Sequence, residues 1–181
     1  VVTVQPANVT PYLGGSATFS PTVTGTQPVS YQWQKQEANG TWSNLAGKTA
    51  GSLIINPVLV SSAGNYRFTA TSPYGSTISS SASLSVIMPP VITVAAQDVN
   101  STTGAAVSFT VEVNGTGPFT YQWQKQEANG NYTNVSGGAQ KTLSLTNVQL
   151  DTNGTYRVSV ANGAGSVHSS ADLNVRLPAN L

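Results

Sequence analysis

The sequence has no cysteine and very little charge. Its 181 residues include seven Lys and Arg, six Asp and Glu and one His, so charged residues make up 7%, where an ordinary soluble domain has roughly 25%. The absence of cysteine excludes thiol catalysis, zinc–thiolate sites and a disulfide framework. It does not imply a reducing compartment, because a domain with a large enough core needs no disulfide.

The scarcity of charge also excludes classes of partner. A net charge of +1 cannot form the basic stripe that nucleic acids require, and attachment to an anionic membrane needs clustered Lys and Arg. The longest apolar stretch, residues 84–96, is interrupted by Pro89 and Pro90 and is too short to span a bilayer. We therefore expect no nucleic-acid partner and no direct membrane insertion. No signal-like segment opens the sequence, so we expect that any secretion signal has been removed.

An internal repeat organises the chain. The decapeptide YQWQKQEANG occurs at residues 31–40 and again, unchanged, at residues 121–130, an offset of 90. The same offset aligns residues 64–67 with residues 154–157, and one residue is lost near the end of the second copy. A unit of this length is large enough to have its own core. We predict two domains, residues 1–88 and 89–181.

The connection between the copies is Ile87-Met88-Pro89-Pro90, and Leu177-Pro178-Ala179-Asn180 occupies the matching place after the second copy. Pro-Pro favours an extended, semi-rigid segment. The equivalent ends suggest that the sequence is cut from a longer array or joins further copies end to end.

The local pattern indicates an all-β fold. Short runs rich in Val, Thr, Tyr and Ile recur between clusters of Gly, Pro and Asn, and no stretch shows apolar residues at helical spacing. Asn39-Gly40 and Asn129-Gly130 each lie between two such runs, which is a strong hairpin signal. We predict about seven antiparallel strands per copy; in the first copy these are Val2–Gln5, Ser16–Thr24, Val29–Gln36, Thr41–Leu45, Ser52–Asn56, Asn65–Thr71 and Ser76–Val86.

Two features in each copy carry a family resemblance. Trp33 and Trp123 lie in the third predicted strand, and Gly64-Asn65-Tyr66 and Gly154-Thr155-Tyr156 precede the sixth. Each copy thereby resembles a cysteine-free immunoglobulin-like domain of the intermediate type, as found in bacterial secreted and surface proteins. The resemblance implies two tandem β-sandwiches in which the tyrosine bonds to the backbone upstream, in a tyrosine corner. The implied core includes Trp33, Tyr66, Phe68, Trp123, Tyr156 and Val158.

The resemblance also locates the positions of the family's inter-sheet disulfide. They hold Pro21 and Phe68 in the first copy and Val111 and Val158 in the second, so apolar packing must supply what a disulfide contributes, typically about 2–4 kcal/mol. The Asp that commonly opens the tyrosine-corner motif is present as Asp151 but is Ser61 in the first copy. We therefore expect a less secure corner in the first copy, and an edge or bulge at Pro21.

Strand alternation assigns a row of glutamines to the outer face of each sheet. If Trp33 points inward, so do Tyr31 and the stem of Lys35, while the glutamines between them face out. Such a row binds sugar hydroxyls, another protein, or only water, and water is the commoner outcome because antiparallel sheets often expose one polar face. The candidate contact face is Gln32, Gln34 and Gln36 with Gln122, Gln124 and Gln126.

No motif supports catalysis, a metal or a cofactor. His168 has no counterpart in the first copy and no nearby nucleophile or acid, so we interpret it as a surface residue. Glu37 and Glu127 recur, but each is expected to be solvated beside a hairpin turn. Residues 151–154 begin like a calcium loop but lack its further acids, so we expect a turn there. We predict that the chain is not an enzyme.

The sequon Asn-x-Ser/Thr occurs seven times, more often than the content of Asn, Ser and Thr gives by chance. A glycan on a surface loop and a simple preference of Asn for turns explain this equally well. The candidate sites are Asn8, Asn39, Asn100, Asn114, Asn131, Asn134 and Asn153.

Three kinds of function remain. The first is a non-enzymatic extracellular spacer or adhesive module of a prokaryotic cell-surface or secreted repeat protein. The second is a subunit of a surface filament, since few lysines are available to protect exposed sheet edges from pairing. The third is a carbohydrate-binding module, in which Trp42 or Tyr132 assists the glutamine rows. Decoration of a phage particle also fits this fold. The expected partners are further copies of the chain or neighbouring repeats, and surface glycans.

Overall fold

The computed structural model describes residues 1–179 and divides into two compact units at Ile87/Met88, one residue before the expected boundary. Residues 180 and 181 of the expected second domain lie outside the described residues. The described chain is all-β: it has no α-helix and two 3₁₀ turns, η1 (Val60–Ser62) and η2 (Leu150–Thr152). None of its helical segments is long and apolar enough to cross a membrane.

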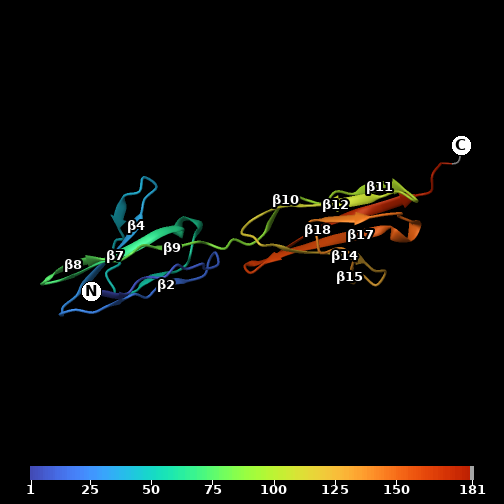
Figure 1. The fold of residues 1–181 in the computed structure, drawn as a ribbon. Helices are drawn as coiled ribbons and strands as arrows, with labels where there is room; N and C mark the ends of the chain where they lie inside the picture. The colour runs from blue at the N-terminus through green and yellow to red at the C-terminus, as the bar shows by residue number, and fades with distance from the viewer. Residues whose placement is uncertain (180–181) are drawn as a thin grey trace. The chain divides into compact units, whose positions relative to one another are not determined.

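The first unit is a two-layered sandwich (Figure 1). One layer has the strand order β5-β4-β7-β8, with β9 also paired to β7. The other contains the pairs β1-β3 and β2-β6. The strands are β1 (Val2–Val4), β2 (Ala17–Phe19), β3 (Thr22–Val23), β4 (Ser30–Gln36), β5 (Trp42–Asn44), β6 (Leu53–Ile55), β7 (Gly64–Ser72), β8 (Gly75–Ile78) and β9 (Ala82–Leu84).

The second unit repeats this plan, with one sheet in the order β11-β18-β17-β14-β15 and the pairs β10-β13 and β12-β16. The predicted hairpins at Asn39-Gly40 and Asn129-Gly130 are confirmed, because each turn joins an antiparallel strand pair. The strands are β10 (Val91–Val94), β11 (Val99–Thr102), β12 (Val107–Thr110), β13 (Glu112–Asn114), β14 (Thr120–Gln126), β15 (Tyr132–Asn134), β16 (Thr142–Leu145), β17 (Gly154–Asn162) and β18 (Gly165–Arg176).

The sequence predicts antiparallel pairing, and this prediction is wrong for one segment in each unit. In the second unit β11 pairs with β18 in parallel, and in the first unit Val9 and Tyr12 make parallel bridges to Leu84 and Ile87. In the first copy, the segment that contains Val9 and Tyr12 has Pro and Gly at several positions. Such a sequence is typical of a loop, and its pairing depends on a partner more than 70 residues away, which local pattern cannot reveal.

A buried tryptophan lies at the centre of each core. Trp33 and Trp123 are both 0% exposed, and their indole N–H groups donate to the carbonyls of Ala50 and Gln140 at 3.0 Å. In the first unit, the Trp33 ring lies 5.1 Å from that of Phe68, which occupies a disulfide position. The burial of both indoles, with their one polar group satisfied, is the arrangement expected of a core tryptophan.

Apolar side chains fill most of the disulfide positions. Phe68, Val111 and Val158 are each 0% exposed, whereas Pro21 is half-buried. The first unit therefore compensates with the larger aromatic ring of Phe68, and the second with two valines. As expected at Pro21, the strand is interrupted there, between β2 and β3. The second unit has the same interruption at Val111, between β12 and β13, so the break does not depend on proline.

Both tyrosine corners form. The hydroxyls of Tyr66 and Tyr156 donate to the carbonyls of Ser62 and Thr152 at 2.6 and 2.8 Å. The expectation of a weaker corner at Ser61 was wrong, because the bond uses the residue after Ser61 or Asp151. The turn itself is closed by the hydroxyls of Ser62 and Thr152, which accept backbone N–H groups at 3.0 Å.

The residue lost from the second copy is a β-bulge in the first. Ile78 lies opposite Thr69, and Ala82 lies opposite Tyr66, so three serines face two residues of β7. The hydroxyl of Ser79 accepts the backbone N–H of Phe68 at 3.0 Å and is buried. The single predicted strand Ser76–Val86 is therefore broken into β8 and β9, whereas β18 is continuous. Extra residues of this kind bend a strand without removing it from its sheet.

Burial raises the pKa of Tyr66, and burial together with the negative charge of Asp151 raises the pKa of Tyr156. The folded state therefore keeps these protons after the unfolded chain has begun to lose them, near pH 10. The stabilisation they supply is complete below about pH 10 and is lost as the pH rises through the folded-state pKa. We expect the free energy of unfolding, measured by urea denaturation, to fall less steeply above about pH 10 in Tyr66→Phe/Tyr156→Phe than in the wild type.

At neutral pH the same double variant should lose about 1 kcal/mol per corner, the typical net value of a hydrogen bond. Tyr74→Phe is the control, because Tyr74 is 83% exposed, and it should retain the wild-type alkaline slope. If the free energy of unfolding of the double variant fell above about pH 10 as steeply as that of the wild type, the two tyrosines would not be the source of this pH dependence.

Candidate contact face and end hollow

The glutamine rows lie on the outer face of the β4 and β14 sheets, opposite the buried tryptophans. Strand register places Gln34 between Asn44 on β5 and Arg67 on β7. Gln124 lies in the same way between Asn134 and Arg157. The six glutamines are half-buried except Gln126, which is exposed.

These residues form what we call the arginine ladder, made of Asn44, Gln34, Arg67 and Trp42 in the first unit. The Gln34 amide donates to Asn44 Oδ1 at 2.9 Å and accepts from Arg67 Nε at 2.8 Å. The Arg67 guanidinium carbon lies 4.2 Å from the centre of the Trp42 ring. Because both ends of the Gln34 amide are bonded, the guanidinium is held in place over the ring.

The second unit repeats the ladder with Asn134, Gln124, Arg157 and Tyr132. Here the Gln124 amide donates to Asn134 Oδ1 at 2.9 Å and accepts from Arg157 Nη2 at 2.7 Å. The guanidinium carbon lies 3.7 Å from the Tyr132 ring centre. The Nε atom of Arg157 is buried without a hydrogen-bond partner, the only such side-chain atom in residues 1–179. The ladder is thus built twice, with tryptophan in the first unit and tyrosine in the second.

The remaining glutamines are also engaged within their own units. Gln32 and Gln122 donate to the carbonyls of Trp33 and Trp123 at 2.9 and 2.8 Å. Gln36 accepts from Asn65 at 2.9 Å. The amides that a ligand would need are therefore largely used by the fold, and the stacked guanidiniums cover one face of the aromatic rings.

Lys35 and Lys125, which recur in the decapeptide, contact the tyrosine corner of their own unit. The Lys35 and Lys125 ammonium groups donate to the carbonyls of Ser61 and Asp151 at 2.5 and 2.6 Å. They also lie 5.6 and 5.9 Å from the ring centres of Tyr66 and Tyr156. Only the backbone of residues 61 and 151 is used here, which explains why Ser and Asp are interchangeable. Lys141 also makes an internal contact, an ion pair with Glu112 at 2.6 Å, so with Arg67 and Arg157 at least five of the seven basic residues contact groups of their own unit.

The catalytic candidates stay apart. His168 is exposed on β18, opposite Ser159 on β17. Glu127 accepts from the Thr133 hydroxyl at 2.5 Å beside its turn, and Glu37 is exposed. Residues 151–154 lie at η2 and the start of β17, the turn that the sequence predicts. No group of three or more His, Cys, Asp or Glu that could hold a metal ion occurs in the described part of the chain.

All seven sequon asparagines are exposed. Asn100 and Asn134 lie on the edge strands β11 and β15, and Asn114 ends β13. Asn8, Asn39 and Asn131 lie outside strands. Asn153 differs, because its amide bonds both the N–H and the carbonyl of Val175. Both ends of the Asn153 amide are thus used by the fold, whereas the hydrogen bonds of Asn8, Asn39, Asn114 and Asn134 use the amide oxygen, and a glycan would be attached to the amide nitrogen.

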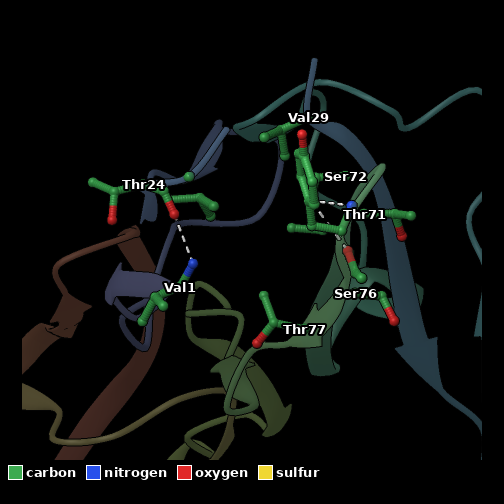
Figure 2. Close-up of a pocket in the computed structure, with 12 residues that line it drawn as sticks. Val1, Thr24, Val29, Thr71, Ser72, Ser76 and Thr77 are labelled. Atoms are coloured by element: carbon green, nitrogen blue, oxygen red, sulfur yellow. Dashed lines mark hydrogen bonds between the residues drawn. The ribbon is translucent and has the colours of Figure 1, made fainter. Parts of the chain in front are cut away.

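A hollow of about 290 Å³ lies at one end of the first unit, and the sequence did not indicate it. Figure 2 shows Val1 and Thr24 on one side and Thr71, Ser72 and Ser76 on the other. Gly25 and Tyr74, from the two loops at this end, also line it. We call it the end hollow. The matching loop and turn of the second unit hold Gly115, Thr116 and Asn162, at the same offset of 90.

Antiparallel layers around a buried tryptophan, closed by a tyrosine corner, define the class of immunoglobulin-like domains. Within this class, the model of the immunoglobulin I-set domain matches residues 1–86 and 90–175. The chain belongs to the I-set family and consists of two tandem I-set domains without cysteine.

The chain is similar to parts of larger proteins. It is 28% identical over 180 residues to Endoglucanase C of Cellulomonas fimi, which covers 98% of this chain and 16% of that protein. It is 28% identical to the basement membrane-specific heparan sulfate proteoglycan core protein of Mus musculus, over 97% of this chain and 5% of that protein. It therefore spans less than a fifth of these relatives. The relatives are largely extracellular or secreted proteins with immunoglobulin domains.

Solved structures confirm the fold. An I-band fragment of titin, I67-I69, matches with a TM-score of 0.80 at 23% identity, covering 98% of this chain and 66% of that chain. At this identity the similarity shows the fold alone. The chain thus consists of tandem modules of the kind found in extracellular adhesion and structural proteins.

We expect the arginine ladder to stabilise each unit independently of any ligand. Gln34→Ala and Gln124→Ala each remove two hydrogen bonds around an arginine and should each lower the free energy of unfolding by about 1–2 kcal/mol in urea. Gln126→Ala is the matched control, because Gln126 is exposed and makes one 3.4 Å contact. An equal loss of unfolding free energy in all three variants would show that the hydrogen bonds of the arginine ladder add no stability of their own.

Proposed function

We propose that the chain is a non-enzymatic extracellular module of a prokaryotic cell-surface or secreted repeat protein, acting as a spacer or adhesive unit. The observation that supports this most is the repeated ladder, in which the glutamine amides of both units are hydrogen-bonded within their own sheet. Amides that are already bonded within the sheet leave little of this face for a ligand, which favours a structural role over a binding role. The alignment of 98% of the chain with a segment of a bacterial protein supports the prokaryotic context.

The absence of a disulfide affects how such a spacer unfolds and refolds when it is stretched. Each unit is held by apolar packing and by strand pairing between distant segments, so its unfolding needs no reduction and its refolding needs no oxidation. A module of this kind can recover after extension wherever it is exported.

Single-molecule stretching of the full chain by its two ends tests the spacer role. We expect two separate unfolding events, each releasing at most about 30 nm, because the first unit has 87 residues. Both events should reappear after relaxation in a buffer without any redox couple. Gradual extension without discrete events would contradict a mechanical role, and hydrolysis of soluble cellulose derivatives by the purified chain would contradict the non-enzymatic proposal.

Carbohydrate binding is a less well supported second function. The aromatic rings are present, but Arg67 and Arg157 stack on Trp42 and Tyr132, and the glutamine amides already have partners. We expect no retained ligand on a glycan array. Binding that is abolished by Gln34→Ala/Gln124→Ala but not by Gln126→Ala would reverse this ranking.

The filament alternative depends on how the sheet edges are protected. The edge strands β5 and β15 have three residues each, and short edges limit pairing with other chains even where lysines are few. Lateral pairing through β5 or β15 therefore has little support. End-to-end association is a separate matter, because it uses the ends of the units.

A further inference from the structure

The pair Asn-Gly recurs along the chain, and the structure places its copies in different surroundings. An asparagine followed by glycine can react with its own backbone, because glycine has no side chain to hinder the approach of its nitrogen to the asparagine side chain. The reaction needs a glycine nitrogen that lies beside the side-chain carbonyl, and an amide nitrogen that is free to leave. The asparagines of these pairs are Asn39, Asn114, Asn129, Asn153 and Asn162.

The two hairpin turns hold the glycine nitrogen away from the side-chain carbonyl. In each turn the N–H of Gly40 or Gly130 donates to the backbone carbonyl three residues earlier, at 2.9 Å. The side-chain carbonyls of Asn39 and Asn129 accept instead from the N–H two residues later, at 3.0 and 2.9 Å. The two reacting groups therefore have different partners in both turns.

Two other asparagines have an amide nitrogen that the fold uses. Asn153 Nδ2 donates to the carbonyl of Val175 at 3.1 Å. Asn162 Nδ2 donates to the carbonyls of Met88 and Thr116, both at 2.7 Å. The fold opposes the departure of either amide, because it would leave these carbonyls without their donor.

Asn114 differs from the other four asparagines. Its Oδ1 atom accepts from the N–H of Gly115, the next residue, at 2.7 Å. Since Cγ is bonded to this oxygen, the glycine nitrogen lies beside the carbon that it would attack, as a near-attack geometry requires. Asn114 is exposed, and its Nδ2 atom makes no hydrogen bond with any residue from 1 to 179. Both conditions for the reaction are therefore met at this position.

We propose that Asn114-Gly115 is a self-modification site, at which the asparagine converts to aspartate and isoaspartate with water as the only co-reactant. The Gly115 nitrogen loses its proton to solvent base and forms a bond to Asn114 Cγ. The bond between Cγ and Nδ2 breaks, and Nδ2 takes up a proton and leaves as ammonia. Water then opens the resulting succinimide ring. Opening at the side-chain carbonyl gives aspartate, and opening at the backbone carbonyl gives isoaspartate, in which the main chain runs through the former side chain.

The modification lies beside the first residues of the second unit. A Cβ atom on Gly115 would lie 2.6 Å from the Pro89 carbonyl oxygen, so only glycine fits here. The Met88 N–H donates to Thr116 Oγ1 at 2.9 Å, and the Met88 carbonyl accepts from the Thr116 N–H at 3.2 Å. Isoaspartate adds an extra carbon atom to the main chain directly before Gly115 and Thr116, and so displaces their backbone from this close fit.

Aspartate at the same position changes the charge and leaves the length of the main chain unaltered. Its carboxylate keeps an oxygen that can accept from the Gly115 N–H. The nearby acid on β13, Glu112, is already paired with Lys141 at 2.6 Å, which limits repulsion between the two carboxylates. Asn114→Asp therefore separates the effect of charge from the effect of the lengthened backbone. The site goes beyond the spacer role and does not depend on it.

Incubation of the full chain in mildly alkaline buffer tests the site, because the glycine nitrogen must lose its proton. Digestion and mass spectrometry of the peptides then measure each asparagine separately. Asn114 should convert about tenfold or more faster than any of the other four asparagines, equivalent to about 1.4 kcal/mol in the barrier.

The matched control is the same chain unfolded in guanidinium chloride, in which all the Asn-Gly pairs have a flexible backbone and should convert at similar rates. Conversion of Asn114 no faster than that of Asn39 or Asn129 in the folded chain would overturn the proposal. An equal preference for Asn114 in the unfolded chain would also overturn it, because the fold would then not be its cause.

Hydrogen exchange of the Met88 amide tests the structural consequence. In chains that carry isoaspartate at position 114, the Met88 N–H should exchange about tenfold or more faster than in fresh chains, equivalent to about 1.4 kcal/mol of lost protection. Fresh Asn114→Asp should exchange like the fresh wild type. Incubated Asn114→Gln should also keep its protection, because the longer side chain closes its ring less readily. Equal loss of protection in either variant would show that isoaspartate is not the cause.

Discussion

The burial of one tryptophan in each unit is the constraint on which the rest of the structure depends. Without a disulfide, the two layers are held together by contacts through Trp33 and Trp123, both fully buried and both bonded through their indole N–H. The strand that carries each tryptophan must then pair with β7 or β17 in one register, which places the tyrosine corner beside it. Truncating such a side chain to alanine typically costs about 3–5 kcal/mol, comparable with the loss of a disulfide.

The same register accounts for the polar face. Because side chains alternate along a strand, an inward Trp33 puts Gln34 outward, opposite Arg67 and Asn44. Lysines one residue further point inward again and reach the carbonyls of Ser61 and Asp151. The recurring decapeptide is thus used on both faces of its strand. This gives its identity in the two copies a structural reason, separate from any ligand.

The two units share the plan of their cores and differ in the last strand of one sheet. The first contains a bulge at Ser79, which divides this strand into β8 and β9, whereas the second has a continuous β18. The difference leaves the buried tryptophan and the tyrosine corner of both units unchanged.

The local sequence determined the fold class, the repeat, the hairpins at Asn-Gly and the identity of the core tryptophans and tyrosines. These features depend on alternation and turn chemistry over a few residues, which a single sequence displays. Only the tertiary structure decided that the glutamine amides are bonded to Arg67 and Arg157, that Ser61 serves the corner as well as Asp151, and that Val9 and β11 pair in parallel with the last strand. Each of these depends on partners far away in the sequence. The end hollow belongs with them, because the loops that line it are distant from one another in the sequence.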